Sequence, residues 1–172
     1  RLTWAAYQSG FMCLTVGSNF VAQLDSATLS LVMPSLNDLT ANDNVPMAVG
    51  IRPQAPPTVT LGAGKDAEPL LNMEFLDLDI DFFALIEDQY IRVMTATVDL
   101  QLPLFLDVDD KGAIVPVLGD MENYIANVRV KNSEALAETA EDLSTRLPVI
   151  LDIALPMLGG ALGSFALPAL GP

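Results

Sequence analysis

The stretch MEFLDLDIDFF, from Met73 to Phe83, decides the fold, because aliphatic side chains and aspartates alternate along it. A period of two is typical of a β-strand, in which successive side chains leave the backbone on opposite faces. The apolar face would carry Leu76, Leu78, Ile80 and Phe82, and the other face Asp77, Asp79 and Asp81. The sequence therefore predicts a strand with one apolar face and one acidic, solvated face.

This strand belongs to the first of three long extended segments, at 69–86, 90–107 and 113–130. In the second, one face carries Met94, Ala96, Val98, Leu100, Leu102, Leu104 and Leu106, and the other largely Thr95, Thr97, Asp99, Gln101 and Asp107. Strands of about 17 residues are about three times the usual length, so they have to curve or coil. In the third segment the phase slips near Gly119, which predicts a β-bulge.

Shorter elements precede these segments. An amphipathic helix is predicted from a cap at Asp25 or Ser26 to Leu39, with a kink at Pro34. The other expected elements are a short helix from Leu2 to Gln8 and strands at Phe11 to Val16, Val45 to Arg52 and Thr58 to Leu61.

A long helix is predicted from Ser133, a suitable N-cap, because apolar residues recur at spacings of three and four. Its apolar stripe consists of Leu136, Ala140, Leu143, Leu147, Ile150, Ala154, Leu158 and Ala161. The polar face ends at Asp152, and a helix that is apolar all round is buried in protein or in lipid. Residues 153–172 carry no charge, but their prolines and glycines argue against a transmembrane span.

Composition points to one domain over residues 1–172 with more apolar side chain than a small domain needs. The hydrophobic fraction is 51% and the charged fraction 17%, against about 25% charged residues in typical soluble proteins. The net charge of −14 would repel nucleic acid and anionic membrane surfaces. The single cysteine, Cys13, is expected to be a small buried hydrophobe, since it has no disulfide partner within the chain.

No constellation for catalysis or for a cofactor stands out. The chain has no histidine, and LGAGK at Leu61 to Lys65 lacks the spacing of a nucleotide-binding loop. DVDDKG at Asp107 to Gly112 resembles the start of a calcium loop, but Lys111 and Leu118 occupy positions that need oxygen ligands. We therefore expect no catalytic residue, metal or cofactor. We interpret the acidic sites as a solvated strand face and a hairpin turn, with weak cation binding as the alternative.

The apolar surfaces leave two possibilities open. The long strands and the long helix could fill each other completely, which is the usual fate of apolar stripes. Alternatively, the helix could lie inside a coiled sheet and leave a channel for an acyl chain or a sterol.

The order of elements also resembles a known family. The stretches WAAYQSGFMCLTV, SLVMPSLNDL, NVPMAVGIRPQAPPTVTL, LNMEFLDLDIDFFAL and GSFALPAL follow one another along the chain. Together they are similar to the carboxy-terminal domain of bactericidal/permeability-increasing protein and its tubular lipid-binding relatives. The resemblance implies an α+β fold in which a long, highly twisted antiparallel sheet rolls around a long C-terminal helix. It also implies that the chain is the carboxy-terminal part of a longer one, with a preceding homologous domain or a protein partner.

In this family the lipid contacts are apolar side chains rather than catalytic groups. At matching positions they would be Phe11, Leu29, Met33, Leu78, Ile80, Phe82, Val98, Leu100, Ile150 and Leu158, each of which could equally be a core residue. The acidity of the chain disfavours an anionic lipopolysaccharide headgroup, so a neutral lipid, a sterol or a phospholipid is expected. The resemblance implies a periplasmic or extracellular location. The alternative function is a ligand-free structural or docking module of an envelope-associated assembly.

Overall fold

The computed structural model describes residues 2–10, 13–17, 25–64, 68–108, 114–118 and 125–148. Its elements are α1 (Leu2–Gln8), β1 (Leu14–Gly17), α2 (Ser26–Leu29), α3 (Leu36–Leu39), β2 (Met47–Pro53), β3 (Thr58–Leu61), β4 (Leu71–Ile86), β5 (Gln89–Val108), β6 (Ile114–Leu118) and β7 (Ile125–Lys131). Residues 140–148 form a further helix. The described strands make one antiparallel sheet, as the family resemblance implies.

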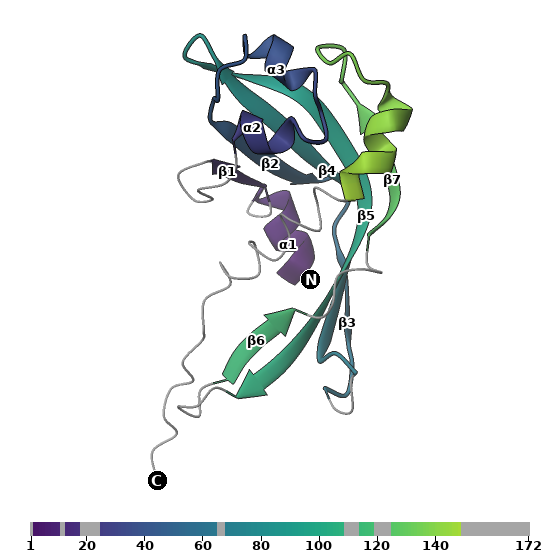
Figure 1. Cartoon of the computed structure of the whole chain (residues 1–172). Coiled ribbons are helices and arrows are strands. Elements are labelled where there is room, and N and C mark those ends of the chain that lie inside the picture. The colour runs from purple at the N-terminus through teal and green to yellow at the C-terminus, as the bar shows by residue number, and fades with distance from the viewer. Residues whose placement is uncertain are drawn as a thin grey trace.

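A long hairpin of β4 and β5 forms the centre of the sheet. The strands have 16 and 20 residues and meet at Glu87 and Asp88, which both have positive φ (48° and 62°). A two-residue turn with that backbone matches the right-handed twist of long strands. Figure 1 shows the hairpin running the length of the molecule, with α2, α3 and the helix 140–148 at one end and β3 and β6 at the other.

Each long strand is flanked by two short strands laid end to end. β2 and β3 pair with successive parts of β4, and β7 and β6 with successive parts of β5, while β1 extends the sheet beyond β2. The pairing of β2 ends opposite Leu78 and that of β3 begins opposite Glu74. We call this level of the sheet, Phe75 to Leu78 on β4, the waist. It divides an upper part that carries the helices from a lower part that carries β3 and β6 (Figure 1).

A β-bulge at the waist changes the phase of β4. Phe75 pairs with Leu100 and Leu78 with Val98, so two residues of β4, Leu76 and Asp77, lie opposite the single residue Asp99. As a result Phe75 shares a face with Leu78, although in a regular strand residues three positions apart lie on opposite faces. The predicted single phase from 76 to 82 is therefore wrong at its first position, and Leu76 is 50% exposed.

α2, α3 and the helix 140–148 cover the apolar face of the upper part of the sheet. Its buried core cluster consists of Leu29, Met33, Leu36, Met47, Leu78, Ile80, Phe82, Ala84, Val93, Met94, Ala96, Val98, Leu100, Leu136, Leu143 and Leu147. Burying apolar side chains contributes about 1.5–3 kcal/mol each, so this cluster is the main source of stability among the described residues.

The helix predicted from Asp25 to Leu39 is replaced by two single-turn helices, α2 and α3. Asp25 is the N-cap, as predicted: its Oδ1 accepts a hydrogen bond of 2.8 Å from the backbone N–H of Thr28. Pro34 lies between the two helices, where its missing N–H and its ring interrupt helical hydrogen bonding rather than only kinking it.

The predicted start of the last helix is also wrong. Ser133 does not cap it; its carbonyl accepts a turn hydrogen bond from Leu136 N–H at 2.9 Å. The helix begins at residue 140, and Thr139 Oγ1 accepts the N–H of Asp142 at 3.1 Å, as an N-cap does. The predicted continuation beyond residue 148 lies outside the described residues, as does the expected bulge near Gly119.

Candidate functional site: the apolar face of the central hairpin

The upper part of the hairpin presents a closed apolar face. Ile80 pairs with Ala96, Leu78 with Val98 and Phe82 with Met94, so the apolar side chains of the two strands lie in rows. The side chains in these rows are all buried. The helix-covered half of the face is therefore a packed core.

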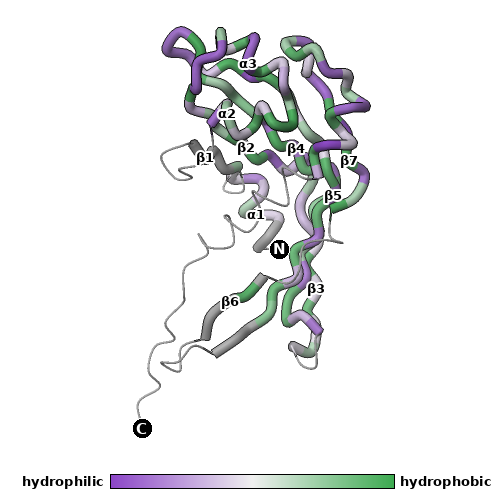
Figure 2. The backbone as a smooth tube through the Cα atoms, viewed as in Figure 1, coloured by the Kyte–Doolittle hydropathy of each residue, from purple (hydrophilic) through white to green (hydrophobic). Residues whose placement is uncertain are grey.

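The same face continues below the waist, where the side chains are only half-buried. Leu71, Met73 and Phe75 of β4 pair with Leu104, Leu102 and Leu100 of β5, and β3 extends two of these rows with Leu61 and Val59. Except for Leu100, which is buried, and Leu61, which is 81% exposed, these residues have intermediate burial. Figure 2 shows hydrophobic residues along the hairpin on both sides of the waist. We call this continuous surface the apolar track.

Seven of the ten predicted lipid-contact residues lie in the core cluster. They are Leu29, Met33, Leu78, Ile80, Phe82, Val98 and Leu100. Phe11, Ile150 and Leu158 lie outside the described residues. Lipid contact by all ten residues stays a prediction. The structure brings Leu78, Ile80, Phe82, Val98 and Leu100 together on the face that the alternation had assigned to them, and Leu29 and Met33 lie in the same cluster from the helical cover.

Sequence reasoning did not identify Leu71, Met73 and Phe75 of the lower track, although the sequence carries a signal for them. Leu71, Met73 and Phe75 alternate with polar residues in the odd phase, whereas Leu78 and Ile80 alternate in the even phase. A change of phase within one strand is what a bulge produces.

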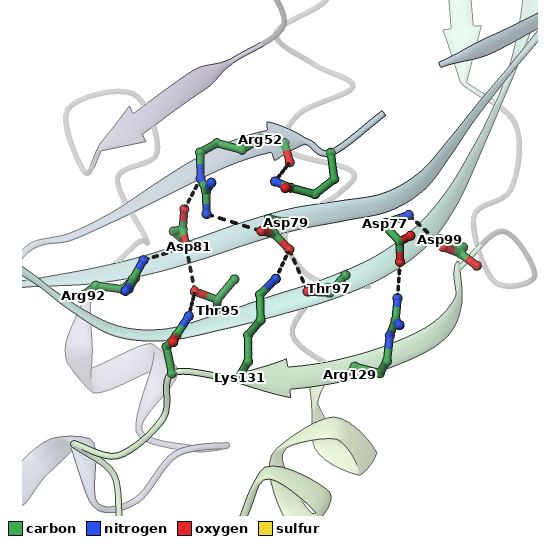
Figure 3. Close-up of polar contacts among 12 residues, drawn as sticks. Arg52, Asp77, Asp79, Asp81, Arg92, Thr95, Thr97, Asp99, Arg129 and Lys131 are labelled. Carbon is green, nitrogen blue, oxygen red and sulfur yellow. Dashed lines mark hydrogen bonds and ion pairs between the residues drawn. The ribbon is translucent and has the colours of Figure 1, made fainter. Parts of the chain in front are cut away.

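The opposite face of the upper hairpin carries a buried ionic network. Asp79 and Asp81 are only 2% and 3% exposed, so the expectation of an acidic, solvated face is wrong for them. Thr97 Oγ1 donates to Asp79 and Thr95 Oγ1 to Asp81, each at 2.7 Å, and both threonines are buried as well. Figure 3 shows these side chains lying between β2 and β7.

Basic residues from three strands complete the network. Arg52 on β2 donates from Nε to Asp81 at 2.6 Å and from an NH2 group to Asp79 at 3.3 Å. Lys131 Nζ on β7 lies 2.8 Å from Asp79, and a guanidinium nitrogen of Arg92 lies 3.8 Å from Asp81. These side chains are about half exposed, so they shield the carboxylates from water while remaining partly hydrated themselves.

The network favours the ionised form of Asp81. Burial raises the pKa of its carboxyl, but the hydrogen bonds from Arg52 and Thr95 outweigh burial and lower the pKa below its usual value. The hydrogen bond to Asp81 in turn raises the pKa of the Arg52 guanidinium. Basic side chains therefore neutralise Asp79 and Asp81. The alternative interpretation of the sequence had assigned these aspartates to weak cation binding.

A second polar cluster, which we call the waist cluster, consists of Asp77, Asp99, Asn127 and Arg129. Asp99 accepts the N–H of Asp77 at 2.9 Å through Oδ1 and the Asn127 side-chain amide at 2.7 Å through Oδ2. These two bonds lower the pKa of Asp99, the one from Asn127 having the larger effect. Arg129 forms an ion pair with the exposed Asp77, as Figure 3 shows.

A group of hydrogen bonds between segments that are remote in sequence helps to join the two parts of the helical cover. The Ser35 N–H donates to Glu138 at 2.9 Å, its hydroxyl donates to the same carboxylate, and Ala137 N–H donates to the hydroxyl at 2.9 Å. Burial raises the pKa of Glu138, but the hydrogen bonds from Ser35 outweigh burial and lower it. This contact ties the segment of α2 and α3 to the segment that leads into the helix 140–148.

The remaining expectations concern metals, membrane spans and Cys13. Within the described ranges, no cluster of three or more His, Cys, Asp or Glu side chains could hold a metal ion. No helix among those ranges is long and apolar enough to cross a membrane. Cys13 is exposed, which corrects the expectation that it would be buried. Most of the DVDDKG turn, from residue 109 on, lies outside the described residues.

Comparison with known proteins supports the fold. No protein-family model matches the chain, and no curated protein sequence does. The crystal structure of a lipopolysaccharide binding protein is similar, with a TM-score of 0.57 and 12% sequence identity over 93% of this chain and 35% of that protein's chain. At that identity the likeness shows the fold alone. The expected fold class, α+β with a long twisted antiparallel sheet, is confirmed.

Proposed function

We propose that this protein binds or transfers a lipid without catalysing a reaction, and that the acyl part of the lipid lies along the half-buried part of the apolar track below the waist. The observation that carries this proposal is the continuity of the track from a closed core into a half-buried surface below the waist. The similar solved structure supports it, because that protein is named for binding a lipid-containing molecule.

The charge of the protein bears on the kind of lipid. The net charge is −14, and in the described ranges four of the five basic side chains are engaged with aspartates on the polar face of the sheet. An anionic headgroup would meet few available cations and a repulsive field. We therefore propose a neutral lipid, a sterol or a zwitterionic phospholipid as the ligand, and a periplasmic or extracellular location. The single domain and its place at the end of a longer chain stay predictions.

Extraction of the purified protein with organic solvent, followed by mass spectrometry, tests the function directly. A lipid species recovered at a stoichiometric amount is the expected result. No lipid, both after purification and after incubation with phosphatidylcholine vesicles, would overturn the proposal.

A substitution on the lower track tests the site. Met73→Glu places a charge on the half-buried surface and should abolish lipid retention, because an ionised carboxylate is costly to bury in contact with acyl chains. Asn72→Asp is the matched control, since it adds a charge to the neighbouring residue on the other face of β4. Equal lipid retention by the two variants would show that the track is not the binding surface.

The docking module remains the second candidate, and exposure of Leu61 on the edge strand β3 favours it. Such an edge could pair with a strand of a protein partner. Size-exclusion chromatography separates the two functions. A lipid carrier should be stable and monodisperse when isolated, whereas a module that needs a partner should aggregate.

A further inference from the structure

Two bulges meet at Asp99. On β4, Leu76 and Asp77 lie opposite Asp99, as described above. On the other side of β5, Thr97 pairs with Arg129 and Asp99 with Ala126, so β7 inserts Asn127 and Val128 opposite the single residue Val98. The bulged residues Asp77 and Asn127 both have left-handed backbones, with φ of 54° and 52°.

Asp99 makes a specific contact with each bulge. An extra residue in a bulge leaves the ladder, so its backbone N–H lacks a strand partner. Asp99 Oδ1 accepts that N–H from Asp77, and Oδ2 accepts the side-chain amide of Asn127. Left-handed conformations of residues other than glycine persist only where surrounding contacts hold them. One carboxylate therefore holds both irregularities at the same level.

The phase of the lower hairpin depends on this arrangement. A slip of one residue turns every following side chain to the other face of a sheet. Without the bulge, Leu71, Met73 and Phe75 would leave the face of Leu78, and Asn72 and Glu74 would replace them. The bulge thus adds the stretch from Leu71 to Phe75, about 13 Å of strand, to the apolar track.

We propose that Asp99 is a positioning residue that keeps the lower track on the same face as the core, and that the lower track in this position selects lipids with long acyl chains. This inference rests on the proposed lipid-binding function. Asp99 touches the bulges and not the apolar face, so its effect on the ligand is exerted through Leu71, Met73 and Phe75.

The first experiment measures, without lipid, which face of β4 carries each residue below the waist. It uses a Cys13→Ser background, which removes the exposed native thiol. Single cysteines at Met73 and Glu74 report which position faces the apolar side, through the emission of an attached environment-sensitive fluorophore. In the otherwise native protein the label at 73 should have the blue-shifted emission. Asp99→Ala should exchange the two spectra, and unchanged spectra would overturn the inference whether or not lipid binds.

A second substitution separates positioning from a general loss of stability. Asp77→Gly supplies a residue that adopts positive φ without strain, so the bulge forms without help from Asp99. In the Asp99→Ala background it should restore the native pair of spectra. Glu141→Ala, which removes an exposed carboxylate from the helix 140–148, is the control and should leave them unchanged.

The preference for acyl-chain length is measured with phosphatidylcholines that carry 12-carbon or 18-carbon chains. The native protein should retain the longer lipid at least tenfold better, since burial of about two further methylenes is enough for a factor of ten. Asp99→Ala should lose this preference, and the added Asp77→Gly should restore it. If the spectra exchange but the native protein retains neither lipid, the lipid-binding function and the selection of chain length fail while the positioning role stands. If the native protein retains both lipids equally, only the selection of chain length fails.

Discussion

Lys131 on β7 reaches past β5 to Asp79 on β4, with Nζ 2.8 Å from Oδ1. Arg52 on β2 contacts the same carboxylate from the other side. One buried aspartate therefore connects strands that are not neighbours in the sheet. The partners on either side limit the sliding of β7 and β2 along the central hairpin, which keeps the apolar rows on the other face aligned.

Replacing Lys131 with Met should lower the free energy of unfolding by about 1–3 kcal/mol, measured by urea denaturation. Asp79 would remain buried with one charged partner fewer, while Met keeps much of the packing of the lysine stem. Arg129→Met is the matched control, because Arg129 lies on the same strand and pairs with the exposed Asp77. Exposed pairs contribute about 0–1 kcal/mol. Equal losses of stability in the two variants would show that the burial of Asp79 does not strengthen its ion pair with Lys131.

Stability should fall in acid, and Asp81 should account for part of the fall. Its folded pKa lies below its unfolded value of about 3.9, so the stabilisation is present above that pH and is lost as the pH falls through the folded pKa. Asp81→Asn should be less stable than the native protein at neutral pH but less sensitive to pH below about 4. Thermal unfolding as a function of pH measures both effects.

The control for this titration is Glu141→Gln, which removes an exposed carboxyl from the helix 140–148. It should leave the acid dependence of the native protein unchanged. An Asp81→Asn curve parallel to the native one throughout the acid range would contradict the role given to the buried network.

Ser35→Ala should loosen the helical cover. The substitution removes the hydroxyl that links Glu138 and Ala137, and a lost bond to a charged group costs about 1.5–3 kcal/mol. Hydrogen exchange should accelerate in α3 and in the helix 140–148 together. Ser30→Ala is the control, because the hydrogen bond of its hydroxyl is a local one, to the carbonyl of Ala27. Acceleration confined to α3 would show that this contact does not couple the two segments.

Two methionines on the same face should respond in opposite ways. Met94 is fully buried in the core, so Met94→Ala should cost about 2–5 kcal/mol of stability. Met73 is half-buried on the lower track, so Met73→Ala should cost less stability and weaken lipid retention more. Denaturant titration and lipid extraction on both variants measure the two effects. Loss of lipid in proportion to loss of stability would argue against a distinct lower binding surface.

Local features of the fold followed from the sequence because their causes are local. The alternation of aliphatic residues with aspartates specified β4 and placed Asp79 on the face opposite Leu78. The cap at Asp25, the helix α1 and the strand β3 were likewise readable, since capping and side-chain period depend on residues within a few positions of each other. The order of elements was sufficient to indicate the fold class.

Which faces of the sheet are buried could be decided only by the tertiary structure. Asp79 is buried because Arg52 and Lys131 arrive from strands that lie 27 and 52 residues away along the chain, and no local pattern contains that pairing. The waist bulge, which turns Leu76 outward and brings Phe75 into line with Leu78, is held by Asp99 from the next strand. The last helix begins at residue 140 and not at Ser133 because the intervening turns bring Glu138 to Ser35. The sequence by itself determined the periodicity of each segment, whereas burial, phase and helix boundaries depended on contacts between segments that only folding brings together.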